Sequence, residues 1–281
     1  MNFDLVLTSD AGKAPAGTAP EGTPWIHRTF TLGAGPRWRA IAETLIAHEA
    51  VWKDAGCVLI LADDVEIGAT AVSELFRVMR TCELRIAQPS LAWSSHFADP
   101  TTLHNPCFVF RHANRVDTAA IAFSTDALRQ CLPLLREVPD AALLARLLPA
   151  MQDDPLAAAV IVDAVQALRT APAAPEEFDE PAWPAALQVD GPHRESSYSW
   201  GGLNLRGQYV CLFTESRDEF LGGLAAGYAC AVQEAQPIGE VFLTHFARSL
   251  ETAPTALELR PPVPPTPALR RSPIIDHRAT A

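Results

Sequence analysis

Two adjacent acids follow the most apolar segment of the chain. Asp63 and Asp64 come directly after Cys57–Ala62, a run without a polar side chain. Adjacent carboxylates at the end of a buried strand cost free energy unless a cation lies between them. A divalent ion chelated by a diphosphate meets this need, because such ions take oxygen ligands from carboxylates and phosphates together. The pair therefore indicates a metal–diphosphate site, with simple capping of the following helix as the alternative.

Further polar groups are expected at the same edge of a sheet. Thr8–Asp10, Gln88–Ser90 and Asp163 stand near the ends of other apolar runs. Doubly wound α/β sheets bind ligands at the carboxyl ends of their strands, near the switch in strand order. We therefore expect these groups to share one site with the acidic pair. The polar segment 90–105 follows the second group and is expected to form a long functional loop.

The spacing of apolar residues predicts the elements that position these groups. The first third of the chain is expected to contain strands at 3–8, 25–32, 57–62 and 84–89 and helices at 37–52 and 69–79. An unbroken apolar run between two helices is typical of a central parallel strand. The order predicts an α/β, Rossmann-like fold with a mostly parallel central sheet flanked by helices and right-handed crossovers.

The remaining chain is predicted to complete the sheet and add a C-terminal part. Strands are expected at 108–111, 116–123 and 158–165, helices at 127–135, 141–151, 220–235 and 240–250, and a hairpin within 196–213. Four regions follow: a core at 1–172, a Pro- and Ala-rich linker or crossover at 173–195, an α+β extension at 196–260, and a Pro-rich disordered tail at 261–281.

Composition restricts the class of protein. The 281 residues carry a formal charge of −11, which argues against nucleic-acid binding because that activity requires clustered Lys and Arg. No apolar run approaches the roughly 20 residues that span a bilayer, and no basic segment precedes the first apolar stretch as in a signal peptide. The six scattered cysteines have apolar neighbours and no C-x-x-C spacing, which favours buried reduced thiols and a cytoplasmic location.

Several short segments, taken in order, resemble a known superfamily. Val58–Glu66 is similar to the strand and D-x-D motif of glycosyltransferase-A-type nucleotide-diphospho-sugar transferases. Gln88–Leu91, Ser94–Phe97, Asn105–Pro106 and Val160–Val165 resemble a narrower branch, the domain-of-unknown-function 707 family. The similarity extends over residues 50–172, with weaker support before them.

The resemblance implies a function and a set of site residues. It implies transfer of a hexose from a nucleotide-diphosphate sugar donor to an unknown glycan, lipid or protein acceptor, assisted by Mg²⁺ or Mn²⁺. It implies that Asp64 and Glu66 bind the metal. Asp140 is the candidate catalytic base, and capping of the N-terminus of the next helix is its alternative role. The nucleotide- or sugar-binding positions are Thr8, Asp10, Asp63, Gln88, Ser90, Ser95, His96 and Arg169.

Three departures from the family pattern leave other functions open. Ala62 replaces the first aspartate of D-x-D, Leu168–Pro172 lacks the family's histidine, and its glycine-rich aromatic stretch is absent. Arg169 is then expected to contact a phosphate directly and reduce dependence on the ion. The departures favour a catalytically degenerate protein that binds a nucleotide sugar or a partner. A metal-dependent phosphohydrolase is a third reading, although it usually needs more carboxylates or a nucleophile motif.

Overall fold

The computed structural model describes residues 3–17, 25–97, 99–138, 140–150, 159–171, 199–212 and 214–234. The predicted linker at 173–195, the helix at 240–250 and the tail at 261–281 lie outside these residues. The first half contains β1 (Phe3–Ser9), β2 (Trp25–Phe30), α1 (Arg37–Ala47), α2 (Glu49–Trp52), β3 (Ala55–Leu61), β4 (Val65–Glu66), α3 (Ala69–Thr81) and β5 (Ile86–Leu91). The second half contains η1 (Pro100–Thr102), β6 (Phe108–Ala113), β7 (Ala120–Ser124), α4 (Thr125–Glu137), α5 (Ala141–Ala150), β8 (Ala159–Arg169), β9 (Ser199–Asn204), β10 (Tyr209–Cys211) and α6 (Arg217–Glu234).

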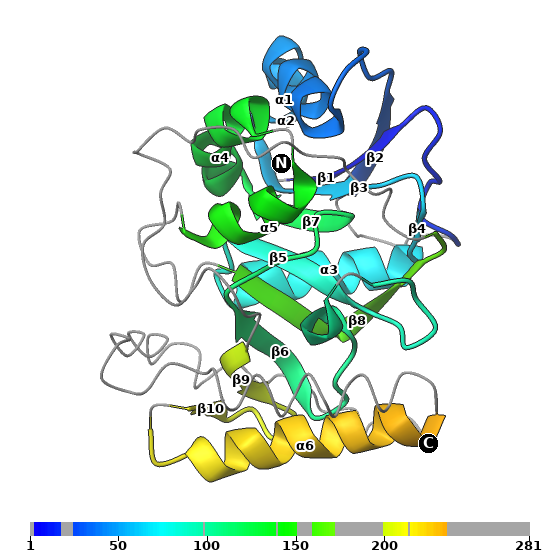
Figure 1. The fold of residues 1–281 in the computed structure, drawn as a ribbon. Coiled ribbons are helices and arrows are strands. Elements are labelled where there is room, and N and C mark those ends of the chain that lie inside the picture. Colours follow the sequence, from blue (N-terminus) through cyan, green and yellow to red (C-terminus); the bar gives the residue numbers. More distant parts are fainter. Residues whose placement is uncertain are drawn as a thin grey trace.

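The described strands form a 10-stranded sheet in the order β10-β9-β6-β8-β5-β7-β3-β1-β2, with β4 paired to β8 (Figure 1). The predicted α/β fold with flanking helices is confirmed, but the sheet is mixed and the expected predominance of parallel pairs is not confirmed. Among the described pairs, β1–β2, β1–β3 and β5–β8 are parallel, and the others are antiparallel. Parallel neighbours need a long crossover. The described residues between β5 and β7 contain no α-helix to supply one.

The central strand β3 has no polar face because helices cover both faces of the sheet. Val58 and Ile60 pack in a buried cluster with Trp38 of α1, while Leu59 and Leu61 pack in the cluster on the α3 face. Figure 1 shows α1 and α4 together at one end of the molecule. Burying each such aliphatic side chain contributes about 1.5–3 kcal/mol, so the whole run stabilises this position in the sheet.

The described part of the C-terminal region extends the same sheet. β9 pairs antiparallel with β6, and β10 pairs with β9 across a turn at Gly207, whose φ is +74°. α6 packs beneath these strands (Figure 1). A Cβ at Gly223 would lie 2.9 Å from Cζ of Phe108, so glycine there permits the close approach of α6. The predicted hairpin and helix are confirmed for these residues, and the predicted division into domains stays a prediction.

None of the helices in the described ranges is long and apolar enough to cross a membrane.

Candidate functional site

A charged cleft of about 480 Å³ opens where β3 ends. Its charged lining residues come from six separate parts of the chain: Arg37, Asp63, Asp64, Asp99, Arg115, Asp117, Asp140 and Arg169. Asp63, Asp64, Asp140 and Arg169 are predicted site residues. The structure therefore brings these four predicted positions together in one cavity.

Arg169 organises the inner wall of the cleft. Its Nε donates to Oδ2 of Asp64 at 2.8 Å, and its Nη1 lies 3.4 Å from Oδ2 of Asp117. Arg169 is the last residue of β8, where it pairs with Val65 of β4. The backbone N–H of Thr170 also donates to the Asp64 carbonyl at 2.8 Å. The guanidinium thus ties the loop after β3 to β8 and to the loop between β6 and β7.

Gln88 and Ser95 hold the backbone of Asp117 and Arg169 by hydrogen bonds. The Gln88 side-chain oxygen accepts a hydrogen bond from the backbone N–H of Asp117, and the Ser95 hydroxyl accepts one from the N–H of Arg169 at 3.1 Å. Both side chains are buried. Ser90 is buried too, and its hydroxyl donates to the Val165 carbonyl at 2.9 Å. These three residues are not among those that line the cleft, and their predicted ligand contacts stay predictions.

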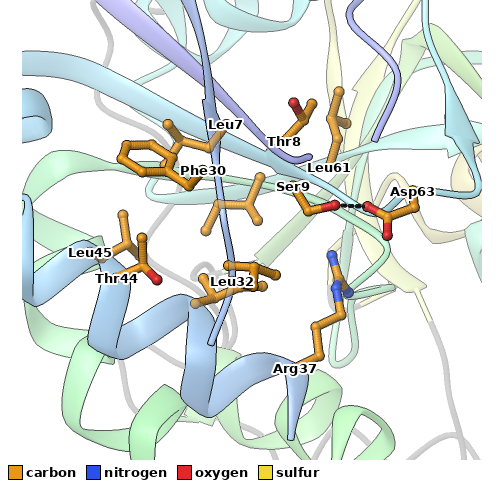
Figure 2. Close-up of a pocket in the computed structure, with 12 residues that line it drawn as sticks. Leu7, Thr8, Ser9, Phe30, Leu32, Arg37, Thr44, Leu45, Leu61 and Asp63 are labelled. Atoms are coloured by element: carbon orange, nitrogen blue, oxygen red, sulfur yellow. Dashed lines mark hydrogen bonds between the residues drawn. The ribbon is translucent and has the colours of Figure 1, made fainter. Parts of the chain in front are cut away.

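A narrow apolar slot of about 30 Å³ adjoins the charged cleft (Figure 2). Its apolar lining residues are Leu7, Phe30, Leu32, Ile41, Leu45, Ile60 and Leu61. Thr8 also lines it and exchanges a 2.9 Å hydrogen bond with Nε2 of His27. Arg37 and Asp63 line both cavities, and the Asp63 carboxylate accepts a hydrogen bond from the Ser9 hydroxyl. The two cavities therefore meet at Arg37 and Asp63.

Arg37 is the first residue of α1, and its guanidinium extends toward Asp63 (Figure 2). Its guanidinium carbon lies 5.2 Å from the centre of the Trp38 ring. It makes no hydrogen bond or ion pair with any residue in the described ranges. Burial lowers the pKa of Arg37, while the charges of Asp63 and Asp64 raise it. The sequence offered one signal for this residue, which is an arginine at a helix start directly after the Gly33–Pro36 turn.

Asp140 caps α5. Its Oδ1 accepts hydrogen bonds from the backbone N–H groups of Ala142 at 2.6 Å and Leu143 at 3.1 Å. The capping alternative is therefore confirmed. Its Oδ2 has no hydrogen-bond partner among the described residues, and Asp140 lines the cleft. Capping leaves one carboxylate oxygen available to a ligand, so the catalytic role stays a prediction.

The predicted metal ligands do not fit a resident divalent ion in this arrangement. Asp64 is paired with Arg169, and Glu66 is paired with Lys13 and does not line the cleft. The described part of the chain holds no group of three or more His, Cys, Asp or Glu placed to hold a metal. Hard cations such as Mg²⁺ require several oxygen ligands at once. The Mg²⁺ or Mn²⁺ site stays a prediction that this donor set does not support.

Asp10 and His96 lie apart from both cavities. Both side chains are exposed, and neither residue lines the cleft or the slot. The contact of His96 with the site is through its backbone N–H, which donates to the Arg169 carbonyl at 3.0 Å. Their predicted roles in ligand binding stay predictions.

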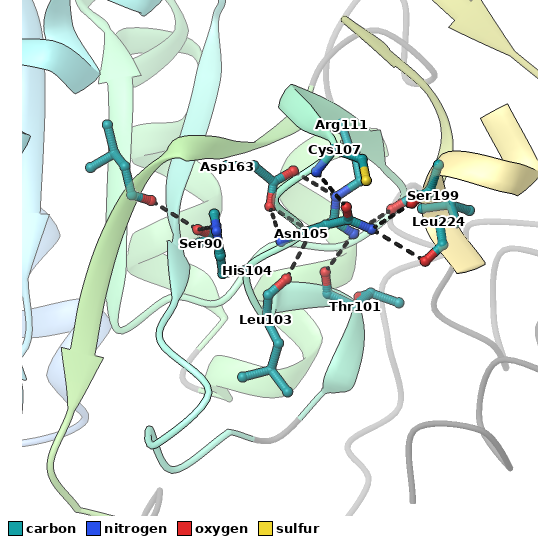
Figure 3. A network of polar contacts seen from close by, with 12 residues as sticks. Ser90, Thr101, Leu103, His104, Asn105, Cys107, Arg111, Asp163, Ser199 and Leu224 are labelled. Atoms are coloured by element: carbon teal, nitrogen blue, oxygen red, sulfur yellow. Dashed lines mark hydrogen bonds and ion pairs between the residues drawn. The ribbon is translucent and has the colours of Figure 1, made fainter. Parts of the chain in front are cut away.

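The expected strand-end position of Asp163 is wrong. β8 continues to Arg169, so Asp163 lies within the strand and is buried. Its carboxylate accepts two hydrogen bonds from Arg111, at 2.7 and 2.9 Å, and one from the N–H of Asn105 at 2.8 Å (Figure 3). Burial raises the pKa of Asp163, and the Arg111 charge opposes this shift. β5 likewise continues to Leu91, so Gln88 and Ser90 are inside a strand rather than after one.

Sequence reasoning missed Asp117 and Arg115 as site residues. Both belong to the connection between β6 and β7. The apolar pattern placed a strand from 116, which turns out to begin at Ala120. Arg115 lies 3.6 Å from the Asp99 carboxylate at the rim of the cleft. Starting the predicted strand after Asp117 would have assigned that carboxylate, like Arg115, to the connecting loop.

Comparisons with known proteins identify no family for this chain. No protein family and no curated protein sequence matches the chain. Among solved structures, the chain is similar to "Crystal Structure of A197 from STIV", with 12% sequence identity and a TM-score of 0.28. That match covers 46% of this chain and 68% of the other.

Proposed function

We propose that the cleft binds a nucleotide-diphosphate sugar and that the protein transfers the hexose to an acceptor. The observation that carries the proposal is the junction of two unlike cavities at Arg37 and Asp63. An anionic diphosphate suits the junction and a hydroxyl-rich sugar suits the charged cleft, while the slot, at about 30 Å³, offers the base an apolar wall to pack against. Small-molecule sites combine an apolar lining with a few convergent polar groups in this way.

Within this proposal, Asp140 acts as the general base. Its free Oδ2 takes the proton of the acceptor hydroxyl as that oxygen bonds to the anomeric carbon, and the bond from that carbon to the diphosphate breaks. The nucleoside diphosphate leaves with the bonding electrons. A positioned base of this kind contributes about 10²–10⁴-fold to the rate.

The test combines binding with turnover. Nucleoside diphosphates and their hexose derivatives are titrated by thermal shift and calorimetry with and without Mn²⁺, and release of diphosphate is assayed with candidate acceptors and with water. Asp140→Asn keeps a side chain that caps helices as well as aspartate does, but removes the base. We expect unchanged binding and a loss of turnover of about 100-fold or more. Asp218→Asn, in the first turn of α6, is the matched control and should retain full turnover.

A binding protein without turnover is the second candidate. Ala62 at the expected acidic position and the pairing of Asp64 with Arg169 favour it. Nucleotide binding without hydrolysis or transfer in the wild type would establish this alternative. Absence of binding to every nucleotide would contradict both. The acceptor and a cytoplasmic location, which rests on the six scattered cysteines, belong to the proposal.

A further inference from the structure

The carboxylates of the cleft already have partners within the protein. Asp64 and Asp117 contact Arg169, and Asp63 accepts a hydrogen bond from Ser9. Asp99 and Asp140 each accept backbone N–H groups. Arg37 differs, because no side chain or carbonyl in the described ranges accepts a hydrogen bond from it. Arg37 is thus the cation of the described cleft without a hydrogen-bond acceptor, and an anionic ligand group would supply one.

The backbone at the start of α1 also favours an anion beside Arg37. α1 has 11 residues, and its N-cap Pro36 makes no side-chain cap hydrogen bond. The first N–H groups of a helix have no intrahelical acceptor, and the helix dipole favours negative charge beside them. Phosphate groups bind at such ends for both reasons. The start of α1 and the Arg37 guanidinium therefore offer donors to the same anion.

Asp64 has a different task from the predicted one. Its side chain accepts from Arg169 and its carbonyl accepts from Thr170. These contacts hold the loop after β3 against the end of β8. Arg169 and Arg37 both line the cleft, and the Arg169 charge lowers the pKa of Arg37. Two arginines thus line the cleft that we propose for the diphosphate, and Asp64 holds one of them in place.

We infer that Arg37 and the N-terminus of α1 bind the diphosphate of the ligand directly, and that Asp64 positions Arg169 instead of a divalent cation. This inference rests on the proposed function and narrows it to metal-independent binding of a nucleoside diphosphate. An arginine fork matches phosphate oxygens in a bidentate arrangement that lysine does not reproduce.

The experiment is calorimetric titration of the full chain in EDTA with UDP, GDP, ADP and inorganic pyrophosphate as probes. We expect the wild type to bind at least one nucleoside diphosphate, with little change when Mn²⁺ replaces EDTA. Arg37→Gln should weaken that binding roughly 10- to 100-fold, the range for one lost charged hydrogen bond. The affinity of Arg37→Lys should lie between those of the wild type and Arg37→Gln. The control, Arg39→Gln, changes an exposed arginine of the same helix outside the cleft and should bind as the wild type does.

The outcomes separate the inference from the proposed function. Binding that requires Mn²⁺ and is unaffected by Arg37→Gln would overturn the inference and leave the proposed function standing. No binding of any probe in either condition would overturn both. If Arg37→Gln does not fold, as judged by circular dichroism, Arg37→Lys decides the role of Arg37 and the wild-type titrations in EDTA decide metal dependence.

Discussion

Two arginine–aspartate pairs in this protein differ strongly in burial, and comparing them tests whether the buried pair stabilises the sheet. Arg111 and Asp163 are 0% exposed and make two hydrogen bonds to each other. Arg129 and Asp126 are 45% and 83% exposed and lie 3.1 Å apart on α4. We propose to replace the arginine of each pair by methionine, which keeps an unbranched apolar stem and removes the charge.

The structure predicts very different losses of stability. Arg111→Met leaves the Asp163 carboxylate buried with the N–H of Asn105, and it also removes donors from the Thr101 and Leu103 carbonyls. Removing one partner of a buried ion pair costs about 3–5 kcal/mol. Arg129→Met removes an exposed pair, for which about 0–1 kcal/mol is the usual range, together with an exposed hydrogen bond to the Lys53 carbonyl.

Urea unfolding at neutral pH measures both values. The double variant Arg111→Met with Asp163→Leu should recover part of the loss, because apolar replacement of a whole buried pair is often neutral or stabilising. Equal and small effects of Arg111→Met and Arg129→Met would refute the buried network. A double variant less stable than Arg111→Met alone would refute the role assigned to the unpaired carboxylate.

Two further predictions concern packing. His112 is buried, stacked on Trp200 at 4.6 Å, and burial lowers its pKa from 6.5 to about 3. Between these pH values the unfolded chain therefore binds a proton at His112 that the folded chain does not bind. Stability should fall as pH drops from about 6.5 toward 3, by up to tenfold in the folding constant per pH unit. His112→Phe should lack this pH-dependent loss of stability in urea titrations, and parallel pH profiles of the variant and the wild type would contradict the prediction. In α6, Gly222→Ala meets nothing within 4 Å and should gain up to about 1 kcal/mol, whereas Gly227→Ala overlaps the Asn105 side chain and should lower the thermal midpoint. Equal shifts for the two glycine variants would show that α6 does not pack as described.

The positions of β3 and of the acidic pair could be predicted because their signal is local. An apolar run with no polar face requires cover on both sides, and a helix pattern on each flank supplies it. The capping role of Asp140 was predictable for the same reason, since a cap depends on the residues just after it. Such features are fixed by a few consecutive residues.

Contacts between residues far apart in the sequence could not be predicted from local patterns. The salt bridge of Arg169 to Asp64 joins residues 105 positions apart, and that of Arg111 to Asp163 joins residues 52 apart. Apolar periodicity shows that a strand has buried faces but not which strand lies beside it, so the antiparallel insertion of β7 between β5 and β3 was not predictable. The same limit hid Arg37, whose importance appears only when α1 and the end of β3 are seen together.

A crystal structure of the protein with the tightest-binding nucleoside diphosphate tests the proposed binding mode most directly. We predict the base packed against the apolar wall that includes Phe30 and Leu32, and the diphosphate within hydrogen-bonding distance of Arg37 and the start of α1. A ligand bound elsewhere, such as between β9 and α6, or a diphosphate in this cleft coordinated through a metal on Asp64 with Arg37 turned away, would contradict it.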